Sequence, residues 1–218
     1  MIGVARNTWR IGGFPFFSIN AYLVDDILVD CGTRWEARRF LKELKGCDLS
    51  MVALTHCHPD HQGAARAICE HFKVPLACHE ADRAAMEGRA PIGPDTLPIR
   101  ISNRFFTGPA YEVARSFTDG DMLGRLRVVH APGHTPGHCM FYREDDALLI
   151  AGDVMANMNF ITLRPGFREP PKFFSHDPAQ NRASMRRILE INPRLVVFGH
   201  GPPVSDLGRL GAFIERLS

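Results

Sequence analysis

The stretch that decides the fold is Thr55-His56-Cys57-His58-Pro59-Asp60-His61. An apolar run at residues 51–54 precedes it and is short enough to be a buried strand. The residues that follow, 62–68, are typical of the opening of a helix. The stretch is therefore predicted to be a strand-to-helix loop, a position where a rigid scaffold presents side chains to a cleft.

Four potential metal ligands fall within this loop. Because side chains at positions i and i+2 of an extended segment point the same way, His56 and His58 can share one ion. Asp60 and His61 lie at the turn into the helix, displaced from the first pair, and that placement suits a second ion. Two metal ions about 3.5–4 Å apart can hold a hydroxide between them and clamp a leaving oxygen.

Three later residues complete the set, and each closes a strand-like apolar run. Each also follows a glycine, which permits a sharp exit from a strand. The runs cover residues 126–133, 147–152 and 195–199, and they lead to His134, Asp153 and His200. A lone histidine is usually a core or surface residue. Seven candidates that all lie at predicted strand ends favour a metal site instead.

In these motifs the chain resembles the metallo-β-lactamase-fold hydrolases, over nearly all of its 218 residues. It is more similar to the glyoxalase II-like and lactonase-like branch than to the secreted β-lactamases. The resemblance implies an α/β fold, a four-layer αββα sandwich. The motifs that carry it are His-x-His-x-Asp-His within residues 55–61, residues 131–138, Ala151-Gly152-Asp153, Phe198-Gly199-His200-Gly201 and, as an early Asp-x-Gly motif, residues 28–33.

The resemblance also assigns roles to single residues. It implies that Asp30 orients the ligands from behind. His138 follows His134 by four residues, but Pro136-Gly137 precludes a helix, so we expect His138 to support the ligands by hydrogen bonding rather than to bind metal. The implied ligands of one ion are His56, His58 and His134, those of the other are Asp60, His61 and His200, and Asp153 bridges the two.

These ligands predict two divalent metal ions and a hydrolytic reaction. Histidine and carboxylate ligands without a thiolate suit zinc, iron or manganese, and we expect zinc. Two dications lower the pKa of a bridging water toward neutrality, so a hydroxide is available to attack an ester, a thioester or a lactone. Asp60 and Asp153 are the predicted catalytic residues, because carboxylates at the water can orient it and shuttle its proton.

Several related enzymes match the chain less well. Secreted β-lactamases lack a bridging Asp at the position of Asp153, and residues 1–7 lack the apolar segment of a signal peptide. Full-length glyoxalase II has a helical substrate domain for which this chain is too short, so only short forms would match. Lactonases of acyl-homoserine lactones carry a Tyr after the bridging Asp, where Val154 stands here, and flavodiiron-type reductases carry a Glu in place of His58.

Three rival functions stay open. A persulfide dioxygenase resembles this family but holds one iron, through the equivalents of His56, His134 and Asp153. Its metal content, about one iron per chain, would distinguish it from a hydrolase with two ions. A phosphodiesterase of the same fold is disfavoured by the near-neutral net charge of +2. A non-catalytic metal-binding module is disfavoured because structural zinc sites are four-coordinate and closed.

The bulk composition is that of an ordinary globular protein, 45% hydrophobic and 23% charged, and we expect one domain over residues 1–218. The net charge calls for no nucleic-acid partner, and no 18-residue apolar run indicates a membrane segment. We expect a cytoplasmic protein with a small-molecule substrate; its oligomeric state is left open. The six cysteines form no C-x-x-C pair, and Cys57 has two readings, a small buried side chain or a redox group.

The remaining chain is rich in strands and interleaved with helices, which fits two packed sheets with helices outside. Two segments, residues 88–118 and 157–176, fit no regular element, and long loops in a compact domain are usually functional. Aromatic and arginine side chains in the second segment could bind substrate or could pack beneath the loop. The substrate-binding candidates are Phe160, Arg164, Phe167, Arg168 and Phe173.

Expected elements follow from apolar runs, helical spacing and turn residues. A hairpin is expected at residues 18–30 and strands at 51–54, 74–78 and 195–198, with three further strands in 119–152. Helices are expected at residues 35–45, 61–72, 80–87, 177–191 and 206–217.

Overall fold

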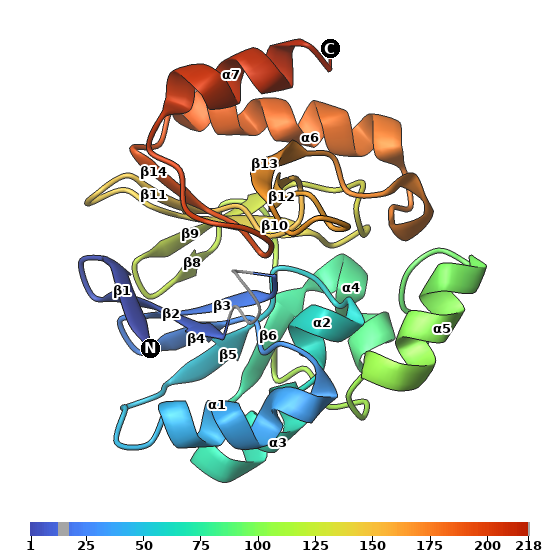
Figure 1. Ribbon diagram of the computed structural model, residues 1–218. Coiled ribbons are helices and arrows are strands. Elements are labelled where there is room, and N and C mark those ends of the chain that lie inside the picture. Colours follow the sequence, from blue (N-terminus) through green and yellow to red (C-terminus); the bar gives the residue numbers. More distant parts are fainter. Residues whose placement is uncertain (13–17, 218) are drawn as a thin grey trace.

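A computed structural model describes residues 1–12 and 18–217 of the chain. Two sheets face each other, and helices cover the outer side of each, which gives four layers (Figure 1). The first sheet has seven strands in chain order: β1 (Ile2–Ala5), β2 (Thr8–Gly12), β3 (Asn20–Val24), β4 (Ile27–Val29), β5 (Met51–Ala53), β6 (Leu76–His79) and β7 (Arg115–Phe117). The second has five, in the order β14 (Leu195–Val197), β11 (Leu148–Ile150), β10 (Cys139–Arg143), β9 (Leu126–His130) and β8 (Met122–Leu123).

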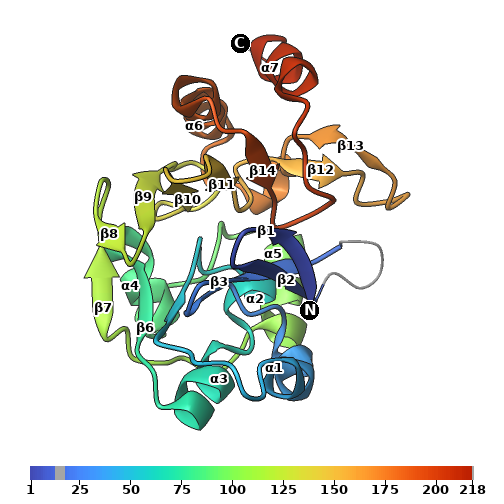
Figure 2. The ribbon, with the colours of Figure 1, turned by 90° about the vertical axis from the view of Figure 1, so that its left-hand side faces the viewer.

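The helices divide between the two outer layers. Helices α1 (Ala37–Glu43) and α3 (Ala65–Phe72) lie outside the seven-stranded sheet, and α6 (Pro178–Ile191) and α7 (Leu207–Glu215) lie outside the five-stranded sheet (Figure 2). The other helical segments are η1 (Arg34–Glu36), α2 (Pro59–Gln62), α4 (Glu80–Met86), α5 (Leu97–Phe106) and η2 (Lys172–Phe174). None of the helices in the described chain is long and apolar enough to cross a bilayer.

Alternation along the strands distributes apolar side chains among three cores. In β3, Leu23 packs with the outer helical layer of its sheet, whereas Tyr22 and Val24 pack between the two sheets. In β10, Phe141 packs between the sheets and Met140 packs in the layer that contains α6 and α7. Because successive strand residues point to opposite faces, this period of two produces the layered arrangement directly.

Strand direction brings the candidate ligands to one edge of the sandwich. Strands β4, β5, β6 and β7 pair in parallel, and so do β11 and β14. Strand β9 runs in the same direction as β11, because each is antiparallel to β10 between them. The loops that follow these strands therefore leave each sheet at its carboxyl edge, where parallel folds commonly place their functional residues.

The four-layer α/β sandwich predicted from the sequence is confirmed, but several elements differ from expectation. Residues 119–152 form four strands rather than three, and the first twelve residues contain two strands that were not predicted. The helix expected over residues 61–72 is interrupted at Gly63, whose N–H donates to Gly32 O instead of continuing the helix. A Cβ at Gly63 would lie 2.3 Å from the backbone nitrogen of Arg34, so this close contact requires glycine.

The two segments predicted to be irregular both contain regular structure. Residues 88–118 include α5, in which Thr96 Oγ1 accepts a bond from the Ile99 N–H. Pro98 lies in the first turn of α5, where no backbone N–H is required, so it begins the helix rather than breaking it. Residues 157–176 include η2 and most of a small two-stranded sheet, β12 (Ala156–Met158) with β13 (Pro165–Arg168).

A hydrogen bond between the sheets gives a test of their packing. The Tyr22 hydroxyl in β3 is buried and donates to Phe198 O, at the end of β14, over 2.8 Å. Replacing Tyr22 with Phe should lower the free energy of unfolding by about 1–2 kcal/mol, measured by urea denaturation. Tyr142→Phe is the control, since the described structure records no hydrogen bond for that hydroxyl on the outer face of β10. Equal destabilisation by both variants would contradict the expected role of the bond.

Candidate metal centre

The seven predicted ligands come from four loops that meet between the two sheets. The loop after β5 carries His56, His58, Asp60 and His61, with the last two in the short helix α2. His134 follows β9, Asp153 follows β11 and His200 follows β14. The structure therefore brings together side chains that lie up to 144 residues apart in the sequence, from His56 to His200.

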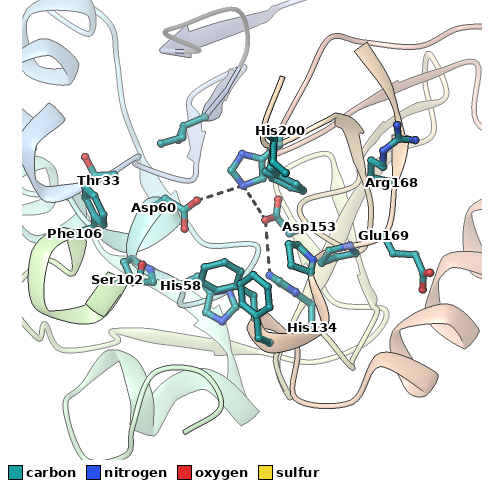
Figure 3. A pocket seen from close by; sticks show the side chains of 18 of the residues that line it. Thr33, His58, Asp60, Ser102, Phe106, His134, Asp153, Arg168, Glu169 and His200 are labelled. Atoms are coloured by element: carbon teal, nitrogen blue, oxygen red, sulfur yellow. Dashed lines mark ion pairs between the residues drawn. The ribbon is translucent and has the colours of Figure 1, made fainter. Parts of the chain in front are cut away.

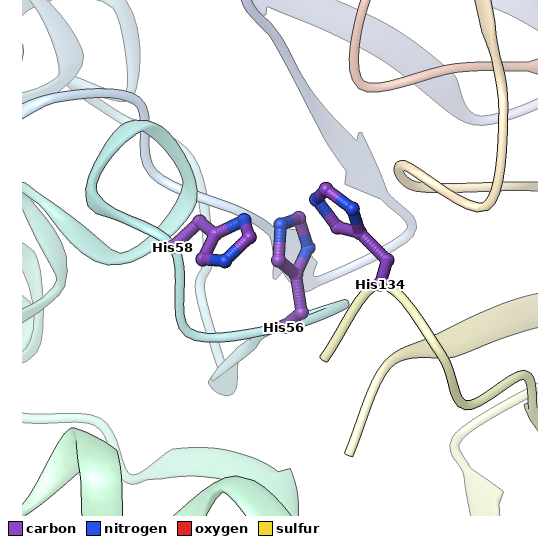
Figure 4. A group of neighbouring side chains, drawn as sticks. All are labelled: His56, His58 and His134. Atoms are coloured by element: carbon purple, nitrogen blue, oxygen red, sulfur yellow. The ribbon is translucent and has the colours of Figure 1, made fainter. Parts of the chain in front are cut away.

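Their ligand atoms form overlapping groups, within each of which the atoms lie no more than 4.8 Å apart. The rings of His56, His58 and His134 lie next to one another (Figure 4), with centroids 4.7 Å apart for His56 and His58, 4.9 Å for His56 and His134, and 4.5 Å for His58 and His134. We call His56, His58 and His134 the first ligand group, and Asp60, His61 and His200 the second. A third group joins His56, His61 and Asp153.

Asp153 lies between the two ligand groups (Figure 3). Its Oδ2 is 3.0 Å from His200 Nε2 and 3.5 Å from His61 Nε2, both in the second group. The same oxygen is 3.8 Å from His134 Nε2 in the first group. Asp60 closes the far side of the second group, with Oδ2 3.3 Å from His200 Nε2.

The buried polar atoms between the two ligand groups are of the types that bind metal ions. Buried nitrogen and oxygen atoms in proteins almost always have a hydrogen-bond partner. Imidazole nitrogens and carboxylate oxygens are also the usual ligands of zinc and of several other divalent ions. Those that point into this centre without a hydrogen-bond partner in the described chain are His56 Nε2, His58 Nε2, His61 Nε2, His134 Nε2 and Asp153 Oδ1.

Asp30 supports ligands of both groups from behind. It follows β4 in a left-handed conformation with φ of 61°. Its Oδ2 lies 2.9 Å from His61 Nδ1 and accepts a bond of 2.8 Å from the Thr55 hydroxyl. The Thr55 oxygen in turn lies 3.0 Å from His56 Nδ1. Because Nδ1 of each ring faces an acceptor, Nε2 presents its lone pair to the centre.

The rings of His134 and His200 have partners that the sequence pattern did not identify. His134 Nδ1 lies 3.1 Å from the Ser175 hydroxyl, which is supplied by the segment after η2. His200 Nδ1 lies against the backbone oxygen of Ser18. Neither partner is near its histidine in the sequence, so no local pattern could have indicated it.

His138 orients Asp153 rather than joining either ligand group. Its Nδ1 lies 3.1 Å from Ala131 O, and its Nε2 accepts the Asp153 backbone N–H over 2.9 Å. Burial lowers the pKa of His138 to about 3, so the ring is neutral and can accept this bond. Both ring nitrogens are therefore occupied away from the centre.

The metal-free protein holds its histidines in two states of charge. Burial lowers the pKa of His58 to about 4 and lowers the pKa of the other two histidines of the first group even more strongly. Burial also acts on His200, but Asp153 and Asp60 outweigh it and raise its pKa to about 10. Metal ligands must be deprotonated, so the first group is ready to bind at neutral pH, whereas binding at the second releases protons.

A pocket of about 630 Å³ opens above the ligands (Figure 3). Three of the predicted substrate-binding residues line it, namely Phe160, Arg168 and Phe173. Arg164 is exposed and outside the lining, and Phe167 packs against Phe213 with ring centroids 5.7 Å apart. Helix α5 adds Ser102 and Phe106 to the wall, which sequence reasoning missed because α5 itself was not expected.

Two further side chains, Cys57 and Asp82, lie within or against the loops that carry the ligands. Cys57 is buried between the first two histidines, and the Cys78 thiol together with burial raises the pKa of Cys57 well above its usual range. That thiol stays protonated, which agrees with the reading of a small buried side chain. Asp82 in α4 bonds to two of the loops and was not predicted; its only local sign was its position one turn beyond a strand end.

Comparison with known proteins identifies the chain's relatives. The model of the metallo-beta-lactamase superfamily matches residues 14–200. The chain is 27% identical over 228 residues to "Probable metallo-hydrolase YflN" of Bacillus subtilis (strain 168), covering 93% of this chain and 85% of that protein. It is 28% identical over 131 residues to the hydroxyacylglutathione hydrolase GloC of Haemophilus influenzae, covering 55% of this chain and 57% of that protein.

Solved structures of other proteins are also similar to this chain over most of its length. TTHA1623 in a di-iron-bound form is 31% identical with a TM-score of 0.67, and the match covers 93% of this chain and 96% of that one. The BLEG-1 B3 metallo-beta-lactamase is 27% identical with a TM-score of 0.67, and the match covers 97% of this chain and 99% of that one.

Substitution of Gly199 can test whether metal binding requires the observed position of the Asp153 carboxylate. A Cβ at Gly199 would lie 2.1 Å from Asp153 Oδ1 and 2.7 Å from His61 Cε1. Gly199→Ala should therefore displace the carboxylate and remove at least one ion per chain, measured by elemental analysis after dialysis. Gly208→Ala is the control, because the nearest atom to its Cβ is 3.6 Å away, and it should bind like the wild type. Full metal content in Gly199→Ala would show that Asp153 can move without consequence.

Proposed function

The chain belongs to the metallo-beta-lactamase superfamily as a metallo-hydrolase, and on that premise we propose that it uses two divalent metal ions to cleave an ester, a thioester or a lactone. The metal that we expect is zinc, because the ligands are imidazoles and carboxylates without a thiolate. Iron is the alternative, since the related TTHA1623 has been solved in a di-iron-bound form.

The observation that carries the proposal is the position of Asp153 between the two ligand groups. Its Oδ2 is 3.8 Å from His134 Nε2 of the first group and 3.0 Å from His200 Nε2 of the second. A carboxylate in that position can be shared by two ions at the separation of about 3.5–4 Å that dinuclear hydrolases use. This supports the proposed assignment of His56, His58 and His134 to one ion, and of Asp60, His61 and His200 to the other.

Two bound dications would lower the pKa of the water they share and stabilise negative charge on the substrate's carbonyl oxygen. The chain's own carboxylates have separate tasks. Burial raises the pKa of Asp60, but His61 and His200 outweigh it and the net shift is downward, so Asp60 is ionised at neutral pH. Asp60 and Asp153 both line the pocket, where they can accept hydrogen bonds from the attacking water, orient it and shuttle its proton.

The pocket supports a substrate with an apolar acyl or aryl part. Around the ligands, its walls consist largely of aromatic, proline and isoleucine side chains, including Phe106, Phe160, Ile161 and Phe173. Arg168 is the only Lys or Arg side chain among the described lining residues, so the pocket offers a site for one anionic group rather than for a polyanion. Glu169 also lines it but bonds to Arg182, at 2.5 and 3.0 Å. We expect a small-molecule substrate on this basis.

Metal stoichiometry is the first test of the dinuclear proposal. The wild type should contain two ions per chain by elemental analysis. Asp153→Ala should lose both and all turnover, because a shared ligand contributes to each ion, whereas His134→Ala or His200→Ala should each retain one. One iron per chain in the wild type, together with persulfide oxidation, would replace this proposal with a mononuclear dioxygenase.

Substrate preference is the second test. Thioesters, lactones and p-nitrophenyl esters of increasing acyl length should be compared with a β-lactam and a phosphodiester. Because burying a methylene contributes about 0.8 kcal/mol, kcat/KM should rise by up to about fourfold per added methylene until the pocket is filled. Phe160→Ala should flatten this rise without changing metal content. Phe167→Ala, in the adjoining strand β13 but outside the pocket, should preserve it. Activity independent of acyl length would contradict the apolar substrate.

A further inference from the structure

Asp82 is a buried carboxylate for which neither the resemblance nor the ligand pattern provides a role. It lies in α4, is 3% exposed, and accepts three hydrogen bonds. Its Oδ1 accepts the Gly137 N–H at 2.7 Å. Its Oδ2 accepts the Thr135 hydroxyl at 2.8 Å and the Cys57 N–H at 3.1 Å. The structure records no ion pair for Asp82 within the described residues, so these bonds are its compensation for burial.

The three donors belong to the two loops that carry the first ligand group. Cys57 lies between His56 and His58, in the loop after β5 of the seven-stranded sheet. Thr135 follows His134, in the loop after β9 of the five-stranded sheet. One carboxylate therefore ties the loop of two histidines to the loop of the third, across the interface between the sheets.

The packing around Asp82 leaves little room for another arrangement. A Cβ at Gly137 would lie 2.7 Å from the Asp82 carboxylate carbon and from its Oδ1. The backbone of this loop thus lies directly against the carboxylate, and its N–H bond depends on the absence of a side chain. An amide at position 82 could keep one acceptor oxygen, but its NH₂ group would face a donor.

The ligands of the second group are supported differently. His61 is held by Asp30, and His200 by the backbone oxygen of Ser18. Neither of them, nor Asp60, has a recorded contact with Asp82. Asp30 reaches both groups, because it bonds to Thr55 as well as to His61. Asp60 and His61 also follow β5, but they lie beyond His58 in α2, where Asp30 holds His61. The bonds of Asp82 are next to ligands of the first group only, because Cys57 lies between His56 and His58 and Thr135 follows His134.

We propose that Asp82 is a positioning residue for one metal site: it fixes the loops of His56, His58 and His134 relative to each other and so sets the affinity of the first ion without setting that of the second. The inference rests on the two-metal centre proposed above and on no particular substrate. Hydrogen-bonding partners behind metal ligands typically contribute 10–100-fold to metal affinity, which gives the scale of the effect.

The experiment measures each site separately by zinc titration against a chromogenic chelator. In a His200→Ala background, which leaves the first site, Asp82→Asn should weaken zinc binding by at least about tenfold. In a His134→Ala background, which leaves the second site, the same change should alter affinity by less than twofold. Cobalt absorption spectra should show the matching difference, a changed ligand field at the first site and an unchanged one at the second.

Milder variants keep the test decisive if Asp82→Asn does not fold. Thr135→Val removes one of the three bonds and should weaken the first site alone, whereas Thr135→Ser keeps the hydroxyl and should restore wild-type affinity. Asp146→Asn is the control, a carboxylate that bonds to Arg143 at 2.8 and 2.7 Å in the β10–β11 turn, away from the centre, and it should leave both affinities unchanged.

Two outcomes would overturn the inference: equal weakening of both sites, which would make Asp82 a general structural residue, or unchanged affinity in both backgrounds. A wild type that binds fewer than two ions would instead refute the proposed dinuclear centre. Two bound ions without hydrolysis of any tested substrate would refute the proposed reaction while leaving the role of Asp82 measurable.

Discussion

The structure depends on keeping several buried polar atoms close together without hydrogen bonds. Four imidazole nitrogens and one carboxylate oxygen meet between the sheets and have no hydrogen-bond partner in the described chain. Each such atom costs about 1–3 kcal/mol when it is buried and unsatisfied. The sandwich must therefore hold them by other contacts until a bound ion offsets that cost, as is usual where local stability is given up for function.

Those other contacts lie one layer behind the ligands and connect distant parts of the chain. Asp30 and Asp82 are both buried carboxylates, and both bond to the loop after β5. His138 holds the backbone of Asp153, and Tyr22 and Asn20 bond to the carbonyl of Phe198, two residues before His200. Ligands from both sheets thus meet at one point, so metal binding is expected to stabilise the packing of one sheet on the other.

Local patterns predicted the fold well where each residue's environment follows from its neighbours in sequence. The alternation in β3 and β10 specifies which side chains face each layer, and the glycines before His134, Asp153 and His200 mark strand exits. Prediction failed where one residue type has two opposite uses. Proline usually breaks a helix, but Pro98 lies in the first turn of α5 and begins it. Gly63 interrupts a helix because another segment of backbone lies against it.

The sequence by itself determined the seven candidate ligands, because each lies in a short motif at a predicted strand end. Its resemblance to the metallo-β-lactamase-fold hydrolases implied the four-layer fold and the role of Asp30. Only the tertiary structure decided which residues stand behind the ligands and which side chains form the pocket. Asp82, Ser175 and Phe106 come close to the centre through the packing of whole loops and helices. Such contacts depend on how distant segments pack against one another in space, and the spacing of residues along the chain does not predict that packing.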